Sequence, residues 1–176
     1  MRACCVIAAH VLLCAAAVRE SDVPPGDGWK HARVVMTDGS SEDATVMMIV
    51  ETVYTPRTDV PGTALYCYDG RLRVRFATRP IDLRSTLLQF RPLARFRTIA
   101  LEIDGQERER TDWAYIKDTG LLIAETRKPA AQTFNAIAKA QTIKFEFRGA
   151  TIEPHTPPID DEFREWIDGC KKLDVL

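Results

Sequence analysis

The chain has 176 residues, with 24 Lys and Arg against 25 Asp and Glu, and a formal net charge of -1. A chain of this length buries roughly two-thirds of its unfolded surface, so one hydrophobic core suffices. The near-zero net charge excludes a global attraction to nucleic acid or to an anionic membrane, and any electrostatic partner must meet a local patch.

The first residues have the order of a signal peptide. A basic start precedes an apolar run from Ala3 to Val18, which only His10 interrupts. The run is shorter than the about 20 residues of a membrane span, and the alanines ending at Ala17 suit a signal peptidase. We expect a signal peptide over residues 1–17 and a flexible Pro- and Gly-rich lead-in over residues 18–28. A short membrane anchor and a mis-assigned start codon are the alternatives.

The cysteines point to export independently. Cleavage would leave only Cys67 and Cys170, an even pair that suits an oxidising compartment. A bridge between them would contribute on the order of 4 to 5 kcal/mol in the chain-entropy model and would tie the last helix to the sheet. Two buried free thiols are the alternative. We expect a periplasmic or secreted protein with no membrane span after cleavage.

The rest of the chain, residues 29–176, has the pattern of one β-rich domain that begins at Trp29. Short alternating runs separated by Asp-Gly and similar turns are typical of antiparallel strands. They predict a mainly β (α+β) fold, an antiparallel β-sandwich or barrel-like sheet. The expected strands are Lys30 to Thr37, Ala44 to Tyr54, Ala64 to Tyr68, Arg71 to Ala77, Phe96 to Ile103, Glu107 to Ile116, Leu121 to Glu125 and Thr142 to Arg148.

Two segments change to helical spacing. Pro129 to Gln141 predicts an internal helix, since Pro is accepted in a first turn. A C-terminal helix should follow Asp160, whose carboxylate can cap it. Apolar residues at i, i+3, i+4 and i+7 place Cys170 on the buried side of that helix.

Arginines alternate with apolar residues along the run from Arg71 to Ala77. Leu72, Val74 and Phe76 should face the core, and the arginines between them should form a cationic outer face. The predicted interaction patch consists of Arg71, Arg73, Arg75 and Arg79. It would suit an acidic ligand or protein, whereas an ordinary solvated sheet face is the alternative. Nucleic acid fits poorly, because aromatic residues do not interleave on that face.

The sequence singles out no catalytic residue, metal site or cofactor site. His31 and His155 are not framed by a serine, cysteine or HExxH motif. The acidic residues between Asp104 and Asp112 fit a solvated hairpin, and those from Asp160 to Glu162 fit the first turn of a helix. We expect a non-catalytic binding or scaffolding protein. An exported hydrolase with paired carboxylates is the alternative, as is an inhibitor with a protruding proline loop at 56–61 or 154–158.

The order of these features resembles the type VI secretion-associated accessory proteins often labelled VasI. The resemblance covers nearly the whole mature chain and rests on Trp29, the Thr37-Asp38 turn, Leu65-Tyr66-Cys67, Arg71 to Val74, Ile103-Asp104, Trp113, Phe134 to Ala140, Ile143 to Phe147 and Cys170. The segment from Thr78 to Arg97 is longer and more basic than the family pattern. The resemblance implies an envelope protein accessory to a secretion apparatus, with another envelope or secreted protein as its partner and no enzymatic site.

Overall fold

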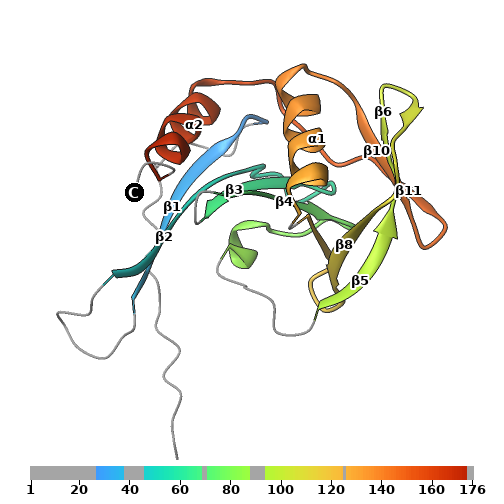
Figure 1. Cartoon of the computed structure of the whole chain (residues 1–176), viewed down its shortest axis with the longest axis horizontal. Coiled ribbons are helices and arrows are strands. Elements are labelled where there is room, and N and C mark those ends of the chain that lie inside the picture. The colour runs from blue at the N-terminus through green and yellow to red at the C-terminus, as the bar shows by residue number, and fades with distance from the viewer. Residues whose placement is uncertain (1–26, 38–45, 69–70, 88–93, 125, 174–176) are drawn as a thin grey trace, which may run out of the picture.

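The computed structural model of the chain describes residues 27–37, 46–68, 71–87, 94–124 and 126–173. The expected signal peptide and most of the lead-in lie outside the described residues. Within the described part, the fold is mainly β, with two antiparallel sheets and two α-helices (Figure 1). The predicted fold class is confirmed in its sandwich form, because each sheet has two open edges in the part of the chain that is described.

The larger sheet, called sheet A, has seven strands in the order β1-β2-β3-β4-β9-β8-β5. The smaller sheet, called sheet B, has the order β11-β10-β6-β7. The bounds are β1 Lys30–Thr37, β2 Val46–Tyr54, β3 Thr63–Tyr68, β4 Arg71–Ala77, β5 Ala94–Ile99, β6 Leu101–Ile103, β7 Gln106–Glu107, β8 Thr111–Ile116, β9 Leu121–Ala124, β10 Ile143–Phe147 and β11 Ala150–Ile152. A short 3-10 helix spans Arg84–Thr86.

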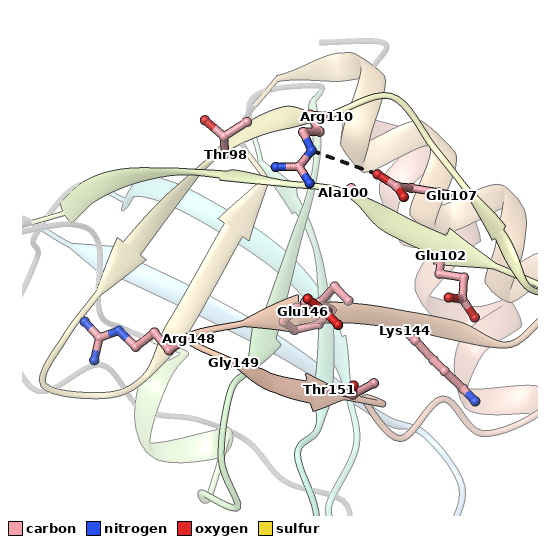
Figure 2. Close-up of a pocket in the computed structure, with 11 residues that line it drawn as sticks. Thr98, Ala100, Glu102, Glu107, Arg110, Lys144, Glu146, Arg148, Gly149 and Thr151 are labelled. Carbon is pink, nitrogen blue, oxygen red and sulfur yellow. Dashed lines mark ion pairs between the residues drawn. The ribbon is translucent and has the colours of Figure 1, made fainter.

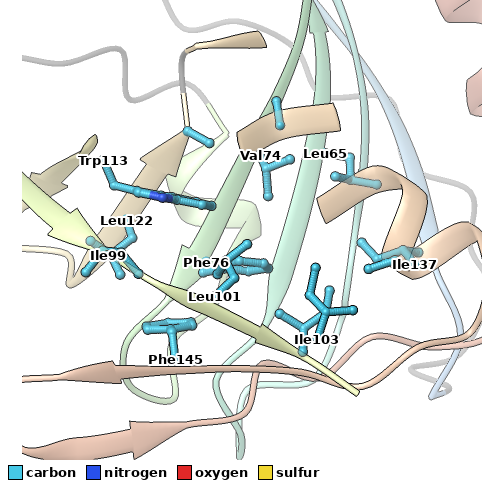
Figure 3. Close-up of a cluster of buried hydrophobic side chains, with 14 of the residues drawn as sticks. Leu65, Val74, Phe76, Ile99, Leu101, Ile103, Trp113, Leu122, Ile137 and Phe145 are labelled. Carbon is cyan, nitrogen blue, oxygen red and sulfur yellow. The ribbon is translucent and has the colours of Figure 1, made fainter. Parts of the chain in front are cut away.

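The main core lies between one face of sheet A and the layer formed by sheet B and the two helices. Helix α1 (Arg127–Ala138) packs on β4 and β9, and helix α2 (Asp161–Leu173) packs on β1, β2 and β3 (Figure 1). Stacked rings join the layers, since Phe76 of sheet A lies 5.5 Å from Phe145 of β10, measured between ring centroids (Figure 3). Trp113, also of sheet A, stacks on Phe76 at the same centroid distance of 5.5 Å. Phe145 belongs to sheet B, so the two sheets share one core.

The chain passes from sheet A to sheet B at Ala100. The sequence predicted one strand from Phe96 to Ile103, but the structure divides it into β5 and β6, which pair with β8 and β10. Ile99, Leu101 and Ile103 remain in the same core on both sides of the break. The alternation therefore persists across the break, and for that reason periodicity did not reveal it.

Two hairpin turns have positive φ at both central residues, the first where a turn was predicted and the second at Arg148-Gly149, where the sequence predicted only the end of a strand. Asp104 and Gly105 have φ of 50° and 75° between β6 and β7, as a two-residue type I′ turn requires. Arg148 and Gly149, with φ of 54° and 78°, make the same turn between β10 and β11. The Asp69-Gly70 turn lies outside the described residues, but Tyr68 and Arg71 on either side of it are paired as a hairpin demands.

Both predicted helices form, with shifted ends. Helix α1 ends before Gln141, because Ala140 adopts a φ of 53° and the amide of Gln141 donates to the carbonyl of Ala136 at 2.9 Å. This is a Schellman ending with alanine where glycine is usual. Helix α2 begins as predicted, since the amide of Phe163 donates to Asp160 Oδ1 at 3.0 Å.

Candidate functional site

The four arginines of the predicted patch do not share one surface. Arg71 and Arg79 are exposed, whereas Arg73 is half-buried with its guanidinium 4.8 Å from the centre of the Tyr68 ring. Arg75 is only 4% exposed. Its guanidinium donates to the carbonyl oxygen of Thr86 at 2.6 Å and lies over the Tyr66 ring.

A second hydrophobic cluster explains the burial of Arg75. The segment after β4 folds back and places Leu83 and Leu87 against the face of sheet A that carries Tyr66 and Ile123. The inward face predicted for β4 is confirmed, because Val74 and Phe76 lie in the main core. The prediction of a solvated cationic face is wrong at Arg75, since sheet A is covered on both faces there. Of the four arginines of the predicted patch, only Arg71 and Arg79 are exposed on the surface.

A polar groove lies on the outer face of sheet B. It has a volume of about 350 Å³, and its lining comes mainly from β6, β7, β10, β11 and the turn between the last two (Figure 2). Ile143, Phe145 and Phe147 of β10 point into the core, so the residues between them are directed to the opposite face. The charged lining residues are Glu102, Glu107, Arg110, Lys144, Glu146 and Arg148.

The groove carries three carboxylates and three cations. Across the strands, Glu102 stands between Glu107 and Lys144 in register. The Arg110 guanidinium lies 3.9 Å from Glu107, and the Lys144 ammonium lies 3.4 Å from Glu153 (Figure 2 shows the first pair). Within the described ranges, Glu102 and Glu146 form no ion pair closer than 4.0 Å. Two carboxylates are therefore available in the groove to an incoming cation.

A separate cluster surrounds His31 where α2 crosses β1 and β2. The imidazole Nε2 lies 2.8 Å from Oε2 of Glu51, a carboxylate that is 6% exposed. The guanidinium of Arg33 holds the other oxygen of Glu51 at 3.2 Å. The imidazole Nδ1 faces Glu165 at 4.0 Å, and the His31 amide donates to Glu162 at 3.3 Å. The sequence analysis looked only for motifs around His31 and therefore missed these neighbours.

The disulfide lies beside the His31 cluster. Cys67 of β3 and Cys170 of α2 are joined across 103 residues of sequence, with their Cα atoms 5.4 Å apart. Cys67 is the register partner of Glu51 on β2. The bridge thus ties the last helix to the sheet, as the sequence predicted.

The two proline loops considered for an inhibitor are fastened to each other. The amide of His155 donates to the carbonyl of Pro61 at 2.7 Å, and the indole of Trp29 donates to the carbonyl of Pro157 at 3.0 Å. Pro157 is buried. These hydrogen bonds tie both loops to the body of the domain, whereas Thr58 and Asp59 in the middle of the first loop are exposed.

Comparison with protein-family models, with curated proteins and with solved structures found no match. No helix among the described residues is long and apolar enough to cross a membrane. The chain is a mainly β protein. It consists of two packed antiparallel sheets, and a disulfide ties helix α2 to the larger sheet.

Proposed function

We propose that this chain is an exported binding protein of the cell envelope, accessory to a secretion apparatus, and that it holds a partner polypeptide in the groove on sheet B. The groove carries this proposal. It places three carboxylates and three cations within a short distance of one another, which suits a partner segment of mixed charge more than a small anion or nucleic acid.

The cysteine pair and the N-terminal pattern support the export part of the proposal. A disulfide that joins distant segments persists in an oxidising compartment and is rare in the cytosol. The resemblance to the type VI secretion-associated family, carried by the residues from Trp29 to Cys170, supports the accessory role.

Intact mass of the protein purified from an exporting host tests export. We expect a mature start near Val18 and two alkylatable thiols that appear only after reduction. An uncleaved chain with free thiols would contradict export, whatever the groove binds.

Site-specific photo-cross-linking tests the groove. A photoreactive amino acid at Thr151, an exposed lining residue, should give a discrete adduct in the envelope, whereas one at exposed Asn135 of α1 should not. The paired swap Lys144→Glu with Glu146→Lys keeps the net charge and should remove the adduct. The matched control is the swap Asp161→Arg with Arg164→Asp, which reverses an exposed ion pair on α2. Equal adducts from both swapped proteins would remove the groove assignment.

The hydrolase alternative would use the carboxylates of the same groove. Paired-carboxylate enzymes shield one carboxyl from water, so that its pKa rises and it can act as an acid. Glu102, Glu107 and Glu146 are all exposed. Their surroundings therefore favour binding over acid catalysis.

A further inference from the structure

We propose that His31, Glu162 and Glu165 form a binding site for a divalent transition metal ion, with Zn²⁺ the ion of best fit. The site lies between β1 and the first two turns of α2, away from the groove of the proposed function and independent of it. One imidazole nitrogen and one oxygen from each carboxylate lie within 4.8 Å of one another.

A small movement would complete the site. Ligand atoms around a tetrahedral zinc ion lie about 3.4 Å apart, given bonds of about 2.1 Å. The Glu165 side chain is 73% exposed and has the freedom to approach by that amount. The imidazole is 15% exposed and needs no movement, because its other nitrogen is already held.

Glu51 orients the histidine as outer carboxylates do in metal sites. When Nε2 carries the proton and donates it to Glu51 at 2.8 Å, Nδ1 keeps its lone pair and directs it toward Glu165. A lone pair then faces a carboxylate oxygen, and the two repel unless a cation lies between them. Arg33 compensates the charge of Glu51 itself, so the carboxylates of Glu162 and Glu165 retain a charge that a dication would balance.

The helix dipole accounts for only part of the cluster. Asp161 and Glu162 lie in the first turn of α2, where acidic residues are favourable. Glu165 lies beyond that turn and, at i+3 from Glu162, shares its face of the helix. Glu162 and Glu165 carry like charges on one face of the helix and therefore repel each other. A metal ion bound by both carboxylates and by the His31 imidazole would explain why Glu165 lies opposite that imidazole.

The ligand set selects the class of metal. Imidazole is a common ligand of zinc and other transition metals, whereas Ca²⁺ and Mg²⁺ take oxygen ligands. Three protein ligands leave a fourth position for water. The bound ion would fasten the start of α2 to β1, just as the disulfide fastens its end to β3.

Calorimetric titration of the untagged, disulfide-bonded protein with Zn²⁺ tests the site. We expect one saturable site, and we expect Glu165→Gln to weaken the affinity at least ten-fold, because it removes a ligand at an exposed position that the fold does not need. Asp161→Asn is the matched control. It removes one negative charge from the same helix but no proposed ligand, and its affinity should stay within about two-fold of the wild type.

A nitrogen-15 spectrum of the imidazoles locates the ion. Zn²⁺ should shift Nδ1 of His31 and leave His155 unchanged, and Ca²⁺ should shift neither. The proposal is overturned if the wild type shows no saturable site, if Glu165→Gln and Asp161→Asn weaken binding equally, or if the His31 resonance does not respond. Because Glu165→Gln leaves His31 and Glu51 in place, the test does not depend on a variant that misfolds.

Discussion

At the scale of single residues, the guanidinium of Arg75 meets a carbonyl oxygen and an aromatic ring in place of water. The contacts with Thr86 and Tyr66 hold the segment after β4 against sheet A. These contacts also replace water around the buried positive charge of Arg75. A buried charge without such partners would lower the stability of the fold.

Truncation of Arg75 should destabilise the fold through this contact. Arg75→Ala leaves the Thr86 carbonyl without its charged donor and opens space beside Tyr66, and we expect a loss of about 2 to 3 kcal/mol in the free energy of unfolding. Urea denaturation measures it. Arg71→Ala on the same strand is exposed and should change stability by less than about 0.5 kcal/mol. Equal effects of the two substitutions would contradict the structural role of Arg75.

The carboxyl of Asp59 should titrate at unusually low pH. Hydrogen bonds from the Arg57 guanidinium lower the pKa of Asp59 to about 2. The folded pKa lies below the unfolded value, so the contribution to stability is present above about pH 4 and is lost as the pH falls through about 2. A carbon-13 NMR titration reads this directly. Arg57→Gln should return the pKa toward its ordinary value, and an unchanged pKa would remove the pairing as its cause.

At the scale of elements, helix α2 depends on its covalent attachment. Loss of the bridge frees a loop of 103 residues in the unfolded chain. The double substitution Cys67→Ser, Cys170→Ser should therefore cost on the order of 4 kcal/mol in urea denaturation. Chemical reduction of the wild type should give the same value. A much smaller loss in both would show that the contacts of α2 hold it without the bridge.

The elements whose signals are local were predictable. Asp104-Gly105 makes a turn that its own residue types favour, and Asp160 caps α2 through an amide three residues away. The break at Ala100 was not predictable, because Ile99 and Leu101 face a single core and leave the alternation intact. Local pattern fixes the type of element but not the sheet to which it belongs.

The sites depend on tertiary contacts and were mostly missed. The burial of Arg75 results from Leu83 and Leu87, which no strand pattern relates to β4. The His31 cluster joins residues separated by 131 positions. One signal was present, since Glu51 is the only acid in the otherwise apolar and Thr-containing strand Val46–Tyr54. The groove was partly visible, because the predicted inward face of β10 implies the opposite face that carries Lys144 and Glu146.

At the scale of the whole molecule, the aromatic contact between the sheets should make unfolding cooperative. Phe145→Ala removes a ring that is 2% exposed and stacks on Phe76 across the layers. We expect a loss of about 3 to 5 kcal/mol. Circular dichroism and tryptophan fluorescence should still report coincident transitions, because both sheets share the core. Glu146→Ala, on the outer face of the same strand, is the control. Separate midpoints for the two probes would mean that the sheets unfold independently.

The bridge between Cys67 and Cys170 also determines how the protein would respond to tension. A force applied to residues beyond Cys170 enters sheet A covalently at β3, and the residues between the two cysteines carry none of it. Sheet B and α1 would thus be shielded while the load passes to the N-terminal strands. Reduction would remove that shielding and release about 350 Å of additional extensible chain. For any attachment made through the C-terminal end, the bridge therefore determines which strands bear the force. It also limits how far the chain can extend.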